Sequence, residues 1–98
     1  MSPYEYDESS MIRLVIRISH SGANLDIELP LSTTGEAIVK HLIDQNQIPQ
    51  RDKEGNPYVY ELISRNNGKK LTLKKSLFDQ KIGENDTLLL APKLVAGK

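Results

Sequence analysis

Apolar residues occupy every second position from Ile12 to Ile18, and the positions between them are polar except for Val15. This period of two is typical of a β-strand with one buried face. A turn signal at residues 21–24, which contains glycine and asparagine, precedes a second alternating stretch at residues 25–29 that a proline ends. Two such stretches joined by a short turn predict a β-hairpin.

The pattern then changes to that of a helix. Thr33 and Glu36 have the spacing of a capping box, in which Thr33 is the N-cap and the Glu36 side chain reaches back to it. Pro49 disfavours a helical residue before it, so the helix is expected to fade at about residues 46–48. The residues predicted to share one helix face are Ala37, Ile38, Leu42 and Gln45.

Strand-like alternation returns after a charged loop at residues 50–57. Residues 58–63 predict a third strand. Asn66-Asn67-Gly68 is a strong turn signal, and Leu71 and Leu73 predict a short fourth strand after it.

The last part of the pattern combines two turns and a strand. Residues 76–79 predict one tight helical turn that places Leu77 or Phe78 in the core, and Phe78 is expected to be buried. A turn at residues 83–86 leads into residues 87–90, which are apolar enough for a central strand.

The order of these elements predicts an α+β domain, with one main helix packed across a mixed sheet of four to five strands. The first and last strands are expected to pair in parallel. A chain of 98 residues can fill one such domain. We expect the domain to span residues 11–91, between a disordered acidic extension at residues 1–10 and a flexible tail at residues 92–98.

Composition narrows the classes of function. The chain has no cysteine, which excludes disulfides, thiolate zinc sites and a cysteine nucleophile. The formal net charge is zero, so no overall field attracts nucleic acid or an anionic membrane. No apolar run reaches the roughly 18 residues of a membrane-spanning helix. Residues 1–10 lack the basic start of a secretory signal, and a cytoplasmic location is expected.

Residues that could carry catalysis or bind a metal do not cluster in the sequence. His20 and His41 lie on different predicted elements and are expected at the surface. Gly68-Lys69-Lys70 lacks the upstream glycine and the following helix of a phosphate-binding loop. We therefore expect no enzymatic activity, no metal and no cofactor.

Lysine and arginine are frequent between residues 65 and 81, where Phe78 is the sole aromatic residue. Nucleic-acid binding by stacking needs more exposed rings than this. A solvated face is the first interpretation of these charges, and docking to an acidic protein surface is the second.

The C-terminal third of the chain resembles ubiquitin. Gly68-Lys69-Lys70-Leu71, Ser76-Leu77 and Thr87-Leu88-Leu89-Leu90 follow in ubiquitin's order and nearly at its spacing. The ending of ubiquitin, Thr-Leu-x-Leu-x-x-Arg-Leu-x-Gly-Gly, resembles the pattern found here, which is Thr87-Leu88-x-Leu90-x-x-Lys93-Leu94-x-Ala96-Gly97. The resemblance covers residues 11–97 and implies a ubiquitin-like β-grasp fold and a bacterial ubiquitin-like protein modifier.

For the tail, the resemblance implies processing after Gly97, which removes Lys98, and then an isopeptide bond between Gly97 and target lysines. The residues expected to be recognised in the tail are Lys93, Leu94, Val95 and Ala96. The implied partners are an E1-like activating enzyme, an E2-like conjugating enzyme, a JAB-type or other processing peptidase, and the target proteins.

For the sheet, the resemblance implies a partner-binding surface at Ile63, Leu89 and Ala91. The alternation is expected to point Ile63 and Leu89 away from the helix, where an apolar pair indicates contact with a partner. A register shifted by one residue would bury them instead.

The tail also departs from the ubiquitin pattern. Ala96 replaces a glycine, Val95 replaces an arginine, and Lys98 lies beyond Gly97. These departures keep an alternative open: a ubiquitin-like interaction module that is not conjugated, similar to the small bacterial accessory proteins of type VII secretion.

Overall fold

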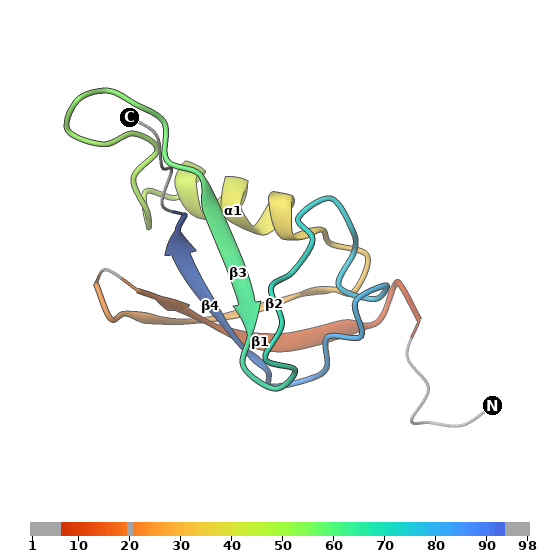
Figure 1. Cartoon of the computed structure of the whole chain (residues 1–98). Helices are drawn as coiled ribbons and strands as arrows, with labels where there is room; N and C mark the ends of the chain where they lie inside the picture. Colours follow the sequence, from red (N-terminus) through yellow and green to blue (C-terminus); the bar gives the residue numbers. More distant parts are fainter. Residues whose placement is uncertain (1–6, 20, 94–98) are drawn as a thin grey trace.

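The computed structural model describes residues 7–19 and 21–93. In chain order its regular elements are β1 (Met11–Ile18), β2 (Asn24–Pro30), α1 (Gly35–Asp44), β3 (Tyr60–Ser64) and β4 (Thr87–Pro92). The described part therefore has the predicted α+β composition, with one four-stranded sheet and one helix (Figure 1). No helix within these residues has the length and apolarity that crossing a membrane requires.

The sheet has the strand order β2-β1-β4-β3. β1 pairs antiparallel with β2 and parallel with β4, and β3 pairs antiparallel with β4. The expected parallel pairing of the first and last strands is thus present, in the middle of the sheet. Helix α1 lies across one face of this sheet (Figure 1).

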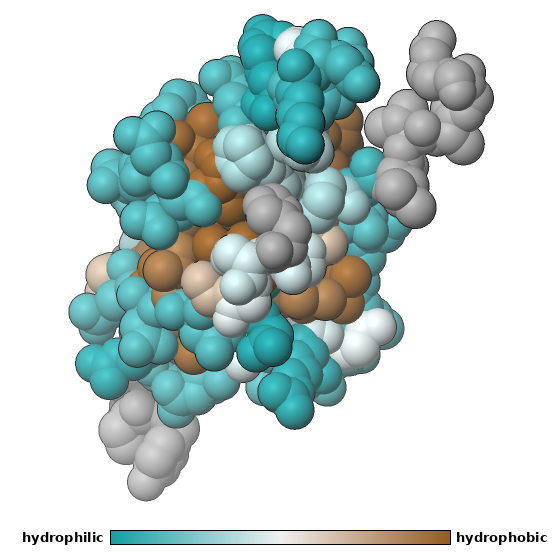
Figure 2. Space-filling view, turned by 90° about the vertical axis from the view of Figure 1, so that its left-hand side faces the viewer, coloured by the Kyte–Doolittle hydropathy of each residue, from teal (hydrophilic) through white to brown (hydrophobic). Residues whose placement is uncertain are grey.

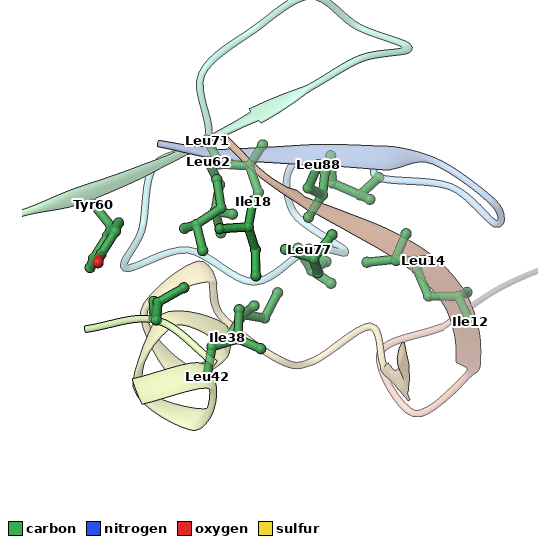
Figure 3. Close-up of a cluster of buried hydrophobic side chains, with 14 of the residues drawn as sticks. Ile12, Leu14, Ile18, Ile38, Leu42, Tyr60, Leu62, Leu71, Leu77 and Leu88 are labelled. Atoms are coloured by element: carbon green, nitrogen blue, oxygen red, sulfur yellow. The ribbon is translucent and has the colours of Figure 1, made fainter. Parts of the chain in front are cut away.

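The core lies between the sheet and α1. The alternating apolar residues of β1 all point into it, and those of β3 and β4 do the same through Leu62, Leu88 and Leu90. Ile38 and Leu42 close the core from the helix side (Figure 3). Each such fully buried side chain contributes about 1.5–3 kcal/mol to stability, which makes this two-layer packing the main source of the fold's stability.

The helix begins one residue later than the sequence predicts. Thr34, not Thr33, is the N-cap: its backbone is extended and its Oγ1 accepts a hydrogen bond of 3.1 Å from the Ala37 N–H. The Thr33 carbonyl instead accepts a hydrogen bond from the Leu77 N–H at 2.9 Å. Among the described residues no hydrogen bond joins Glu36 to Thr33, so the predicted capping box is wrong.

The helix ends at Asp44, before the predicted residues 46–48. Asn46 has φ of 60° and turns the chain into the left-handed region, which asparagine tolerates well. The Asn46 N–H bonds to the Ile43 carbonyl and the Gln47 N–H to the Leu42 carbonyl. These two hydrogen bonds form a Schellman motif, which ends the helix upstream of the residues whose helical conformation Pro49 would disfavour.

The buried face of α1 differs in part from the predicted one. Gly35, Ile38 and Leu42 are buried, whereas Ala37 and Gln45, which the pattern placed on the same face, are exposed. A Cβ atom on Gly35 would lie 2.9 Å from the Leu73 Cδ2 atom. The first turn of the helix therefore packs closely against residue 73 because residue 35 has no side chain.

The third strand is shorter than predicted, and the fourth predicted strand is absent from the described chain. β3 begins at Tyr60 because the Tyr58 N–H is directed to the Gln50 carbonyl, at 2.9 Å. The Leu71 N–H bonds to the Leu62 carbonyl, and Lys70 forms one isolated bridge to β3. Residues 71–73 continue as irregular chain.

The Gln80 side chain holds this irregular segment together. Its Oε1 accepts a hydrogen bond from the Thr72 N–H at 2.6 Å, and its Nε2 donates to the carbonyl oxygens of Thr72, Lys75 and Ser76. One side chain thus replaces the ladder of hydrogen bonds that a strand would have supplied.

The turn at residues 76–79 buries Leu77 completely, whereas Phe78 remains 39% exposed. The prediction that Phe78 lies in the core is wrong. The Leu77 N–H bonds to the Thr33 carbonyl and the Phe78 N–H to the Leu31 carbonyl, so the turn is tied to the β2–α1 connection. In this arrangement one of the two neighbouring side chains enters the core and the other remains partly at the surface.

Residues 7–10, which the sequence assigns to the extension, form a turn that is hydrogen-bonded to the domain. The Ser32 N–H bonds to the Glu8 carbonyl at 2.7 Å and the Leu31 N–H to the Ser10 carbonyl at 2.9 Å. Hydrogen bonds from Ser9 to the Asp7 carboxylate lower the pKa of Asp7. The described chain therefore already contacts the domain before β1.

A buried carboxylate joins the start of β4 to the turn after β3. Asp86 is 1% exposed; its Oδ2 accepts a hydrogen bond of 2.6 Å from the Ser64 hydroxyl, and its Oδ1 accepts one of 3.1 Å from the Asn66 N–H. The Ser64 Oγ in turn accepts from the Asn67 N–H at 3.1 Å. The sequence predicts turns at both places but gives no sign that they are joined.

We expect Asp86→Ala to lower the free energy of unfolding by about 2 kcal/mol, because it leaves the Ser64 hydroxyl and the Asn66 N–H without their buried acceptor. Asp79→Ala is the matched control, since Asp79 is exposed and should change stability by less than about 0.5 kcal/mol. Urea denaturation of both variants measures the difference. Equal stability of the two variants would contradict a structural role for the Asp86 network.

Candidate protein-binding surface on the sheet

The face of the sheet opposite α1 carries the residues that the sequence proposed for partner binding. Leu62, Leu88 and Leu90 point into the core, so the strand residues between them point to the other face. Ile63, Leu89 and Ala91 are on this outer face and are half-buried.

The strand register brings two of these residues into direct contact range. Ile63 of β3 is the cross-strand partner of Leu89 in β4, and Leu89 is in turn the partner of Arg17 in β1. Arg17, Leu89 and Ile63 therefore form one row across three strands. Ala91 belongs to the next row, where its partner is Glu61.

A shallow hollow of about 400 Å³ lies over this row. Leu89 and Ile63 form its apolar part, and the exposed Arg17 and Arg65 lie at its rim together with Thr87. We call these five residues the outer-face surface. Its combination of an apolar centre and cationic rim suits a partner that presents an apolar side chain next to carboxylates.

The turn after β3 positions the rim of the hollow. The Gly68 N–H bonds to the Ser64 carbonyl at 2.8 Å, and Gly68 has φ of 69°, a conformation that residues with a Cβ rarely adopt. The Arg65 N–H bonds to the Thr87 carbonyl at 2.9 Å. The Asp86 network holds the same turn from the core side, so Arg65 is placed by several backbone contacts.

Charged groups near the outer-face surface are partly paired. Lys70 and Glu61 form an ion pair of 3.2 Å. The Arg17 guanidinium makes one long hydrogen bond, of 3.5 Å, to the Asn24 side chain. The ion pairs within the described residues are Lys70–Glu61 and Lys40–Asp44, so neither arginine of the surface is held by a carboxylate.

The sequence missed Arg17 and Arg65 as members of this surface. Arg17 is distant in sequence from β3 and β4, and only the register of the β1–β4 pair places it beside Leu89. Other hydrophobic side chains are also exposed, namely Met11 at 52% and Val59 at 48%. Seen from the end where the β1–β2 turn lies, the molecule has hydrophobic areas between hydrophilic ones (Figure 2).

The predicted tail lies almost wholly outside the described residues. Lys93 is exposed, and its N–H bonds to the Val59 carbonyl at 2.6 Å. The predictions for Leu94, Val95, Ala96, Gly97 and Lys98 stay predictions, because these residues fall beyond the described chain.

Of the two histidines that are expected at the surface, the structure describes His41 alone. His41 is exposed on α1, and His20 lies outside the described residues. Within residues 7–19 and 21–93, no group of three histidine, aspartate or glutamate side chains is arranged to hold a metal ion.

Leu88 and Leu89 are neighbours in β4 that point to opposite faces, and truncating each should have a different effect. We expect Leu88→Ala to lower the free energy of unfolding by about 2–5 kcal/mol, because it opens a cavity in the core. Leu89→Ala should cost less, about 1 kcal/mol, because that side chain lies on the outer face and is partly exposed. Chemical denaturation measures both values, and equal losses would mean that Leu89 is a core residue.

Comparison with known proteins adds information at the level of the fold. No family model matches the chain, and no curated protein matches its sequence. Among solved structures it is similar to a de novo designed protein based on ubiquitin, with a TM-score of 0.65 and 22% sequence identity over 90% of this chain and 96% of that one. This likeness confirms the predicted α+β class and the ubiquitin-like β-grasp fold.

Proposed function

We propose that this protein is a ubiquitin-like protein that binds other proteins through its outer-face surface. The observation that carries the proposal is the row of Arg17, Leu89 and Ile63, which places two half-buried apolar side chains on the uncovered face of the sheet. Polar residues are the usual choice for such a face. An apolar centre that lies between arginines is a composition typical of protein interfaces.

The energetics favour a partner protein that presents a small apolar side chain next to acidic residues. Apolar area that a partner removes from water contributes roughly 25 cal/mol per Å². Arg17 and Arg65 can each donate several hydrogen bonds to a carboxylate, which orients the partner and selects against basic ones. The apolar centre thus supplies binding energy and the arginines supply specificity.

The test begins with a photo-crosslinking amino acid at position 89, which captures the natural partner for identification. With the purified partner, Leu89→Ala should raise the dissociation constant about tenfold, a loss of about 1.4 kcal/mol. Val59→Ala is the matched control: Val59 is an apolar residue that is 48% exposed and lies outside the outer-face surface. Calorimetric titration measures both. An equal effect of the two substitutions, or no effect of Leu89→Ala, contradicts the proposal.

A second function, conjugation through Gly97, is favoured by the sequence of the tail in the context of this fold. Leu88 and Leu90 of the tail pattern are buried core residues of β4, so this half of the pattern serves the fold. Lys93, the one residue of the other half that the structure describes, has an exposed side chain. Small residues at positions 96 and 97 would suit passage of an extended tail through a narrow enzyme channel.

In this second function a processing peptidase first hydrolyses the bond between Gly97 and Lys98. The freed Gly97 carboxylate attacks the α-phosphate of ATP in an E1-like enzyme, and pyrophosphate leaves. An enzyme cysteine displaces AMP to form a thioester, which passes to an E2-like enzyme. A target lysine amine then displaces the thiol and forms the isopeptide bond.

Chains ending at Gly97 and at Lys98 distinguish the two functions when each is mixed with the cognate activating enzyme and ATP. Conjugation predicts pyrophosphate release and a reducible thioester with the Gly97-ended chain alone. If both chains are inert, conjugation through Gly97 is wrong. The protein is then an interaction module without conjugation, as in the type VII secretion accessory alternative.

A further inference from the structure

A second hollow, of about 520 Å³, lies at the end of the molecule where β1 begins. Its apolar lining comes from Ile12, Leu31 and Ile82, which are buried, and from Phe78, which is 39% exposed. We call it the Phe78 hollow. The Phe78 N–H bonds to the Leu31 carbonyl at 2.9 Å, so the backbone holds these two parts of the lining together. The hollow therefore has a floor of core residues and one aromatic side chain that solvent reaches.

This arrangement suits a single large side chain of another protein. Aromatic and other large side chains that fill such hollows supply much of the binding energy in protein interfaces. The exposed face of an aromatic ring such as that of Phe78 also attracts cations. The lining thus favours an apolar side chain that has basic neighbours.

Most of the charged side chains around the hollow are carboxylates. Asp79, Glu84 and Lys81 are exposed and contribute to its lining. The exposed Glu8 belongs to the turn that is hydrogen-bonded to the residue after Leu31, at the same end of the molecule (Figure 1). None of these four charged groups forms an ion pair within residues 7–19 and 21–93. Three carboxylates beside one amine select for a cationic partner.

The charge of Arg13 does not cancel these carboxylates. The Arg13 N–H donates a hydrogen bond of 2.9 Å to the Glu84 Oε2 atom, which holds that carboxylate near the start of β1. Ile12 and Leu14 point into the core, so the Arg13 side chain points to the other face of the sheet. The hollow and the arginine side chain are thus on different faces.

We propose that the Phe78 hollow is a second protein-binding site, which takes one large apolar side chain that is flanked by lysine or arginine in a partner protein. The apolar side chain would pack against Phe78 over the buried floor, and the basic side chains would lie near Asp79 and Glu8. The outer-face surface has the opposite preference, because arginines form its rim. The charge of a ligand therefore separates the two surfaces, and this proposal does not depend on the other one.

The test uses two blocked pentapeptides and the complete chain with labelled methyl groups and aromatic rings. We expect the peptide Lys-Lys-Phe-Lys-Lys to shift the signals of Leu31, Phe78 and Ile82 on titration. The peptide Glu-Glu-Phe-Glu-Glu should bind there about tenfold more weakly, because it brings carboxylates next to carboxylates. The peptide Lys-Lys-Ala-Lys-Lys should bind about tenfold more weakly too, because it lacks the side chain that fills the hollow.

A charge reversal distinguishes recognition from a loss of folding. The double variant Glu8→Lys/Asp79→Lys should prefer the glutamate peptide to the lysine peptide, and an unfolded chain cannot produce this exchange. Phe78→Ala should weaken binding of the lysine peptide about tenfold. Val59→Ala is the matched control: Val59 is an apolar residue that is 48% exposed and lies outside the hollow, so this variant should bind as the unaltered chain does.

Several results would overturn the proposal. The lysine peptide could shift the signals of Ile63 and Leu89 instead, or shift no signals at all, or the double variant could keep the original preference. In the chain without peptide, a nuclear Overhauser contact between the Phe78 ring and the Tyr6 ring or a second copy of the chain would also contradict it. The occupant of the hollow would then be this chain itself.

Discussion

The parallel pairing of β1 with β4 is the interaction on which the rest of the structure depends. It sets Ile16 beside Leu88 and Ile18 beside Leu90, so that the apolar faces of the two central strands coincide. Backbone hydrogen bonds from the Val15 N–H to the Asp86 carbonyl and from the Ser19 N–H to the Leu90 carbonyl fix this register. A slip by one residue would turn every side chain of β4 to the opposite face.

The same register determines what the protein presents to others. Because Leu88 and Leu90 fill the core, Leu89 must lie on the outer face, and there it meets Arg17 and Ile63. Because β1 and β4 occupy the middle of the sheet, β2 and β3 lie at its two edges. The pairing of β1 with β4 therefore determines which side chains reach the outer face and which strands lie at the edges of the sheet.

The parts of the fold that could be predicted from the sequence are those in which the period of apolar residues is strong. The β1–β2 hairpin and the final strand are of this kind, and burial of their alternate residues leaves few choices. The predicted start of α1 is one residue too early because Thr33 and Thr34 are equally good N-caps. The hydrogen bond from the Leu77 N–H to the Thr33 carbonyl, which favours Thr34 as the cap, joins segments that are distant in sequence. The predicted burial of Phe78 is wrong because an irregular turn has no hydrophobic period that indicates which side chain is buried.

The candidate site was less accessible from sequence than the fold. Ile63 and Leu89 could be proposed from alternation and from the resemblance to ubiquitin, but Arg17 joins them only through pairing between distant strands. The Ser64–Asp86 hydrogen bond and the contacts of the Gln80 side chain also connect segments that no local pattern relates. Which residues meet at the site is determined by pairing between distant strands and turns, and local sequence propensity does not reveal that pairing.

The β1–β4 register places Leu89 and Ile63 on the outer face and Leu88 and Leu62 in the core. Methyl-labelled protein with a soluble paramagnetic agent tests it most directly, because the agent broadens the signals of methyl groups that it can approach. With the register described, the Leu89 and Ile63 methyl signals should broaden and the Leu88 and Leu62 signals should be unaffected. Protection of Leu89 together with broadening of Leu88 would contradict it.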